Sequence, residues 1–119
     1  MSQFYVGSVG GNTPFGPVNI TFVVSTILPT PPLSYTVLAA DQFILVNTDN
    51  SIVTILLPNT TTTGRLIVIK DWTGNAANYP ITVTTVGGSV TIDEATSIDI
   101  DTNFGSLNLI FEGTNYSTW

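Results

Sequence analysis

The chain has 119 residues, of which 43% are hydrophobic and 8% are charged, against roughly 25% charged residues in ordinary globular proteins. Two basic and eight acidic residues give a net charge of -6, so the sequence cannot supply a basic surface for nucleic acid or an anionic membrane. No apolar run approaches the ~20 residues of a membrane-spanning helix, the N-terminus lacks the pattern of a secretory signal, and there is no Cys for a disulfide.

The first third of the sequence is expected to be an N-terminal arm. Residues 1–33 are rich in Gly and Pro, and they contain one probable strand, 18–24, in which apolar and polar residues alternate. Three prolines in the segment 25–34 remove hydrogen-bond donors and favour an extended joint. We therefore place the boundary near Leu33 and assign 34–119 to a β-structured head domain.

The sequence of the head domain predicts an all-β unit with turn residues between short strands. Strand-like runs recur about every 8–12 residues, no segment has a convincing helical period, and no tandem repeat of fixed length is seen. The expected strands are 35–39, 43–46, 52–57, 66–70, 81–86, 90–92, 98–100 and 107–111. This spacing predicts a small sandwich, barrel or prism-like β domain.

The two cations of the chain bracket one apolar run. Arg65 and Lys70 lie on either side of 66–69, a segment that is apolar on both faces and is expected to be buried between two layers. In a chain with so few charges, this placement indicates an architectural role. We expect Arg65, Lys70 and the adjacent Asp71 to form structural charge pairs with neighbouring strands or chains.

Enzymatic chemistry finds little support in the sequence. Without His or Cys there is no Ser-His-Asp or Cys-His arrangement and no soft-metal site, and no phosphate-binding loop is present. Asp71 with Asp93 could form a glycosidase pair only if the fold brought them across a cleft. Asp99 and Asp101 are weak candidates for a hard cation and more simply the polar face of a strand. We therefore expect a protein that is not an enzyme and needs no cofactor or metal.

Aromatic residues beside turns are the remaining candidates for ligand binding. Rings at such positions can stack on sugars, although they also cap the ends of β cores. The aromatic residues in such positions are Trp72, Tyr79, Phe104, Tyr116 and Trp119. Among them, Trp72, Tyr79 and Tyr116 are the candidate glycan-stacking residues.

The order of motifs from Tyr35 to Trp119 resembles a β domain that recurs in fibre and tail proteins of phages and large DNA viruses. The most distinctive part is the central run of Leu-Pro, Gly-Arg, Ile-Lys-Asp and Gly-Asn-Ala. In this sequence, the matching positions are Leu57-Pro58, Gly64-Arg65, Ile69-Lys70-Asp71, Gly74-Asn75-Ala76, Val90-Thr91-Ile92-Asp93 and Asn103-Phe104-Gly105-Ser106. The chain departs from the pattern at Glu94, where such sequences usually carry Gly.

The resemblance implies a non-enzymatic structural or attachment domain that assembles as a homotrimer. It implies a place on the virion surface, assembly in the host cytoplasm, and contacts of residues 1–33 with other virion proteins. A host surface receptor or glycan would then be the ligand of the head. Two alternatives remain open: a monomeric carbohydrate-binding or adhesin module, and a capsid cement protein whose arm inserts into a neighbour.

Overall fold

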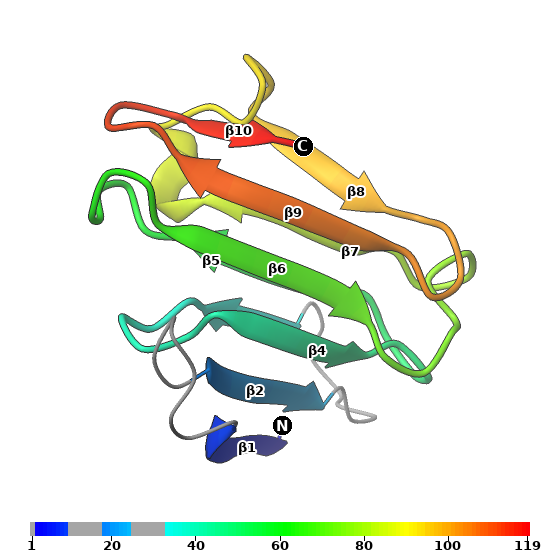
Figure 1. Cartoon of the computed structure of the whole chain (residues 1–119). Coiled ribbons are helices and arrows are strands. Elements are labelled where there is room, and N and C mark those ends of the chain that lie inside the picture. Colours follow the sequence, from blue (N-terminus) through cyan, green and yellow to red (C-terminus); the bar gives the residue numbers. More distant parts are fainter. Residues whose placement is uncertain (1, 10–17, 25–32) are drawn as a thin grey trace.

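The computed structural model describes residues 2–9, 18–24 and 33–119, with side chains described at 20–21 and 34–119, and almost every element in these residues is a β-strand (Figure 1). The single helical turn, η1, covers Val86–Gly88. The strands are β1 Ser2–Val9, β2 Val18–Val24, β3 Leu33–Thr36, β4 Phe43–Asn47, β5 Val53–Leu57, β6 Leu66–Asp71, β7 Ile81–Thr85, β8 Ser97–Ile100, β9 Ser106–Phe111 and β10 Tyr116–Thr118. The expected all-β fold class is confirmed.

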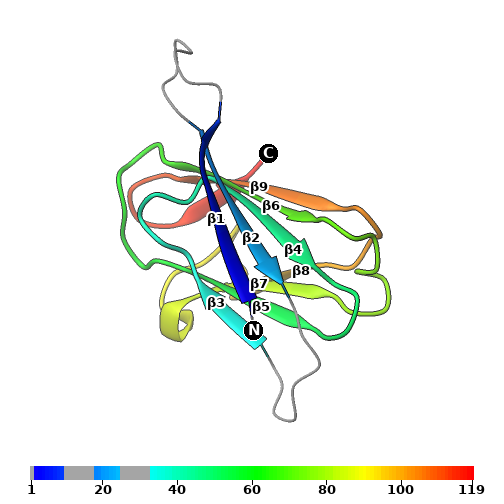
Figure 2. The same ribbon diagram turned by 90° about the horizontal axis from the view of Figure 1, so that it is seen from below.

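The strands form two sheets that face each other, as the view from below shows (Figure 2). Within the described residues, sheet A has the order β1-β2-β4-β6-β9-β10 and sheet B the order β3-β5-β7-β8. Of the three architectures that the sequence allowed, the sandwich is the one adopted.

The chain winds between the two sheets as a flattened coil. From β2 to β7 successive strands alternate between sheet A and sheet B, so β2, β4 and β6 pair in parallel on one side and β3, β5 and β7 on the other. Corresponding positions are Ile20, Phe43 and Val68 in sheet A. Their separations differ from one turn of the coil to the next, which explains why no repeat of fixed length is visible in the sequence.

The hydrophobic core lies between the sheets and follows from the period-two pattern of the strands. In β4, β5 and β7 buried and partly exposed residues alternate, and the buried positions carry Val, Ile or Leu at all but one place. The exception is the buried Thr85 at the end of β7. Three further strands, β6, β8 and β9, add Ile67, Ile69, Ile100 and Leu109 to the same layer.

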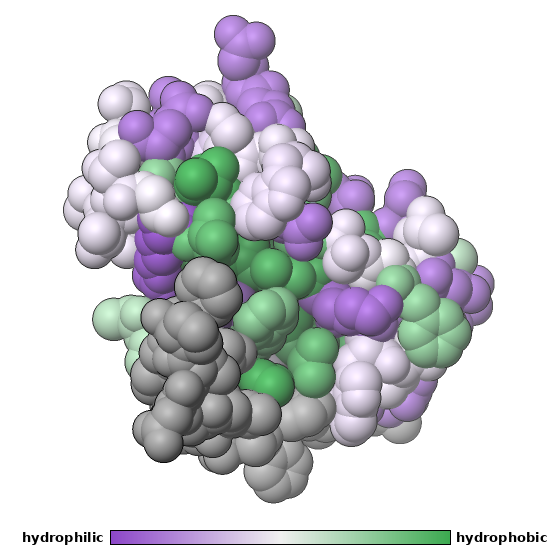
Figure 3. All heavy atoms as spheres, viewed as in Figure 1, coloured by the Kyte–Doolittle hydropathy of each residue, from purple (hydrophilic) through white to green (hydrophobic). Residues whose placement is uncertain are grey.

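The outer faces of the two sheets differ sharply in chemistry. The outward positions of sheet B are mostly hydroxyl-bearing, and they line up in register across the strands as Ser34, Thr54, Thr82 and Asp99 and as Thr36, Leu56, Thr84 and Ser97. The outward face of sheet A carries partly exposed apolar residues, here called the sheet A apolar face: Ile20, Phe43, Leu45, Leu66, Val68 and Ile110. Apolar side chains gather over the middle of this face in the space-filling view (Figure 3).

Several details differ from the expectation. Residues 90–92 form no strand, because Ile92 makes only isolated bridges to Ala95 and Tyr116. Strand β10 was not expected, since it is only three residues long. The segment 66–69 is buried on one face only, and Leu66 is 42% exposed within the single chain.

The expected N-terminal arm is described only in part. Residues 1, 10–17 and 25–32 lie outside the described residues. Strand β2 spans the expected range 18–24 and pairs with β1 and with β4 of the head. The division between arm and head stays a prediction, but the strands on both sides of it share sheet A.

Candidate functional site

The functional candidates lie at the two ends of the sandwich, because each loop described between β3 and β10 lies at one end or the other. The Arg65 end holds the loops 37–42, 58–65, 86–96 and 112–115, at the left in Figure 1. The Asp71 end holds the loops 48–52, 72–80 and 101–105, at the right. Each end is considered in turn.

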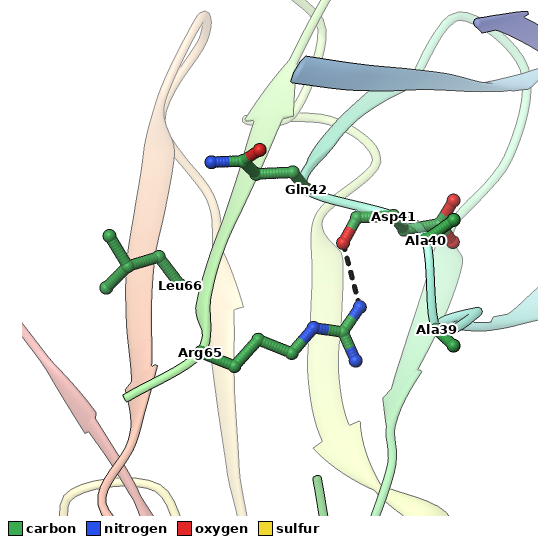
Figure 4. A pocket seen from close by; sticks show the side chains of 6 residues that line it. All are labelled: Ala39, Ala40, Asp41, Gln42, Arg65 and Leu66. Atoms are coloured by element: carbon green, nitrogen blue, oxygen red, sulfur yellow. Dashed lines mark hydrogen bonds between the residues drawn. The ribbon is translucent and has the colours of Figure 1, made fainter. Parts of the chain in front are cut away.

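A shallow hollow of about 340 Å³ opens at the Arg65 end (Figure 4). It is lined by Ala39, Ala40, Asp41, Gln42, Arg65 and Leu66. The guanidinium of Arg65 reaches across it and donates from Nη2 to the main-chain oxygens of Leu38 at 2.7 Å and Asp41 at 2.8 Å. Its Nη1 donates to the Thr61 hydroxyl at 3.2 Å. The side chain therefore fixes the turn before β4 to the start of β6.

Asp41 beside this hollow is a buried carboxylate held by neutral donors. Its oxygens accept hydrogen bonds from the hydroxyls of Thr21 and Tyr35 and from the Leu38 N–H at 2.8 Å. The carboxylate thus joins β2, β3 and the following turn. Because both Arg65 and Asp41 are engaged in holding the fold, the hollow presents no paired nucleophile and base.

Asp71 has the same role at the opposite end, with a larger set of donors. This fully buried carboxylate accepts from the Thr48 hydroxyl at 2.7 Å and from the main-chain N–H groups of Gly74 at 3.0 Å, Ala76 at 3.0 Å and Phe104 at 2.9 Å. Burial disfavours the charged form, but these hydrogen bonds outweigh it and hold the pKa of Asp71 below its ordinary value. Three loops are therefore fixed to one charge.

The expected charge pairs take a different form in the structure. The described contacts of Arg65 are with two main-chain carbonyls and a hydroxyl, as given above. Lys70 donates to the main-chain oxygen of Phe104, and its Nζ lies 5.7 Å from the centre of the Phe104 ring. Asp71 receives only neutral donors. Within the chain all three side chains hold loops in place through carbonyl, hydroxyl and N–H groups, and charge pairs with a neighbouring chain stay a prediction.

The candidate aromatic residues lie at different ends of the sandwich. Trp72 is 47% exposed at the Asp71 end, and Tyr79 is partly exposed on the same connection. Tyr116 was wrongly expected to be exposed: it is 1% exposed, its ring packs on Phe111 with centroids 5.0 Å apart, and its hydroxyl donates to the Pro58 oxygen at 2.7 Å. Tyr116 closes the core and offers no face to a ligand.

The structure makes Phe104 a candidate for ligand binding at the Asp71 end. It is 59% exposed and has a φ of 61°, a conformation that bulky residues rarely adopt. Its ring lies against Gly74, where a Cβ would overlap the ring atoms. The sequence places Phe104 only among several aromatics near turns, and its left-handed conformation has no signature in the residue pattern.

The acidic candidates are not brought together. Asp71 and Asp93 lie at opposite ends, and Asp93 instead accepts from the N–H of Thr118 at 3.0 Å and from its hydroxyl, which lowers the pKa of Asp93. Asp99 and Asp101 are both exposed. Among the residues that the structure describes, no group of three His, Cys, Asp or Glu side chains is placed to bind a metal ion.

No protein-family model and no curated protein matches the chain. In the part of the chain that the structure describes, no helix is long and apolar enough to cross a membrane.

Proposed function

We propose that this chain is a non-enzymatic structural protein of a virus particle, the head domain of a fibre or tail that assembles as a homotrimer for attachment or decoration. The observation that supports assembly is the contrast between the two outer faces of the sandwich. Sheet B presents hydroxyl groups to its surroundings, whereas sheet A presents apolar side chains that a lone subunit would leave in contact with water.

The sheet A apolar face is continuous across four strands. Ile20, Phe43 and Val68 are neighbours in register on β2, β4 and β6, and Leu66 is opposite Ile110 on β9. Large apolar side chains that are contiguous on one face are typical of an interface rather than of scattered surface residues. Their position on the six-stranded sheet gives a broad surface for contact with other copies of the chain.

The charge distribution favours another copy of the same chain as the partner. Although the net charge is -6, none of the described outward residues of β4, β6 and β9 is acidic. The cation on this face, Lys70, is engaged with the main-chain oxygen of Phe104 at its margin. Three copies can therefore turn these faces toward a common axis without opposing carboxylates.

Assembly gives the head its function through multivalent display. Three weak ligand sites on one rigid head gain avidity for a host receptor or glycan without tight individual binding. On this proposal the head lies at the virion surface and residues 1–33 contact other virion proteins. The second candidate, a monomeric carbohydrate-binding module, is favoured by the exposed rings of Trp72 and Phe104. A capsid cement protein would use the same face and a similar arm.

Molar mass by size-exclusion chromatography with light scattering tests the proposal. The wild type should elute at three times the 12.7 kDa of one chain. Val68→Asp introduces a charge into the sheet A apolar face and should lower that mass, whereas Thr84→Asp on the outward face of sheet B should leave it unchanged. A folded wild-type monomer at micromolar concentration would refute trimeric assembly and favour the single-chain module.

A further inference from the structure

We propose that Phe104 and Trp72 form a binding platform for a neutral saccharide at the Asp71 end of the sandwich. The proposal rests on the attachment role above, because it names the site and the ligand class that each subunit of the head would display.

The ring of Phe104 is held outward against the preference of its own backbone. An aromatic residue at φ 61° is strained, and such strain persists at functional sites when surrounding contacts fix the conformation. Both main-chain groups of Phe104 are fixed: its N–H donates to Asp71, and its oxygen accepts from Lys70. The ring nevertheless stays 59% exposed, so this arrangement contributes little to the core.

The second ring lies on the segment that supports the first. Phe104 lies against Gly74 and near the Nζ of Lys70, and Trp72 is between these two residues in the chain. The Trp72 side chain is 47% exposed, and the main-chain N–H of this residue donates to the main-chain oxygen of Val46 at 2.9 Å. Two exposed aromatic side chains therefore emerge from loops whose backbones are both fixed to Asp71.

Three amide side chains belong to the same two loops as the rings. The Asn103 oxygen accepts from the Ala77 N–H at 2.9 Å, which leaves its amide N–H donors without a partner among the described residues. Asn75 donates to the Thr48 oxygen at 3.3 Å, and Asn78 donates to the side-chain oxygen of Asn75 at 2.9 Å. Fixed amides beside an aromatic face suit a ligand with an apolar C–H face and hydroxyl groups at its edge, which is the chemistry of a pyranose ring.

The negative net charge of the chain favours a neutral sugar as the ligand. With a net charge of -6, and with Lys70 already engaged, the platform has no cation available to pair with a carboxylate or sulfate on the ligand. A platform of two exposed rings favours weak single-site binding, of the order of millimolar Kd, which the proposed trimer would strengthen by avidity.

Saturation-transfer difference NMR on the full chain tests the site. The probes are the methyl glycosides of glucose, galactose and N-acetylglucosamine, with methyl sialoside as the anionic comparison. At least one neutral glycoside should receive saturation from the protein, and Phe104→Ala and Trp72→Ala should each weaken its binding about tenfold. Trp119→Ala is the matched control, because Trp119 is 63% exposed but follows β10, away from the platform, and it should bind as the wild type does.

Gly74→Ala provides an independent test of the Phe104 position, since the added methyl group must displace the ring. Variants are compared only after circular dichroism shows the wild-type spectrum, and Trp72→Ala alone decides the outcome if the Phe104 and Gly74 variants do not fold. A wild type that binds none of the neutral glycosides, equal binding by Trp72→Ala and Trp119→Ala, or preference for the sialoside would overturn the platform. A trimer that binds no sugar refutes this inference alone, whereas a monomer that binds through Trp72 supports the platform and refutes the assembly.

Discussion

Replacing Asp71 by Asn should destabilise the protein strongly, although the two side chains have nearly the same shape. In the wild type each carboxylate oxygen accepts two hydrogen bonds, and Oδ2 serves the N–H groups of Ala76 and Phe104. In Asp71→Asn an NH2 group would replace one oxygen. In place of Oδ2 it would face two N–H donors, and in place of Oδ1 it would face the Gly74 N–H and the Thr48 hydroxyl, which can turn to accept. At least one buried donor is left without an acceptor, at about 1–3 kcal/mol, and the remaining hydrogen bonds lose their charged acceptor, so the expected loss is about 2–6 kcal/mol. For a domain of this size that is a fall of roughly 10–20 °C in Tm.

Thermal and urea unfolding followed by circular dichroism would measure this loss. Asp99→Asn is the control, because Asp99 is exposed on sheet B and its replacement should change Tm by no more than a few degrees. The pKa of Asp71 lies below its ordinary value, so its contribution is present above pH ~4 and is lost as the pH falls through the folded-state pKa. The difference between wild type and Asp71→Asn should therefore narrow below pH ~4. A variant as stable as the wild type at pH 7 would refute the view that this carboxylate holds the three loops.

Three further predictions concern the Arg65 end. Arg65→Ala should lower the free energy of unfolding by about 1–3 kcal/mol, because two main-chain carbonyls lose a charged donor, whereas Thr62→Ala should leave it nearly unchanged in the same urea titration. Glu94→Gly should raise Tm slightly, by the equivalent of about 0.5–1 kcal/mol, because Asp93 and Glu94 both have positive φ; a lower Tm would contradict this. Burial raises the pKa of Tyr116 to about 12, with the Arg65 charge opposing the rise, so stability should be lost between pH ~10 and ~12; Tyr116→Phe should reduce that alkaline loss in circular dichroism.

Most strands could be predicted from the sequence because alternating burial is a local property. The expected ranges 43–46 and 107–111 match β4 and β9 to within one residue at each end. The pairing of the strands could not be predicted in the same way, since a period of two does not say which neighbour a strand takes. The parallel pairing of β2, β4 and β6 is a property of the structure alone, in which Ile20, Phe43 and Val68 are in register.

Only part of the candidate site could be predicted from the sequence. Placing Arg65 and Lys70 at the two ends of one strand was informative, but the carbonyl oxygens that they bind belong to loops distant in the chain. Tyr116 could not be distinguished from an exposed aromatic, because its burial depends on contact with Phe111 and Pro58. The sequence also could not tell the two faces of the segment 66–69 apart: the side chain of Ile67 is fully buried in the core, whereas that of Val68 faces outward.

The coiled path of the chain has a consequence for how quickly the protein can fold. Each parallel pair joins strands that are one full turn of the coil apart, from Leu33 to Val53 and then to Ile81 in sheet B. Closing such loops costs entropy before any ladder forms, so refolding should be slow for the size of the chain, in about milliseconds to seconds. The hairpin of β9 and β10 closes over a short connection and is the natural place for structure to begin. Substitutions there should slow refolding in stopped-flow experiments, whereas substitutions in β3 should mainly accelerate unfolding.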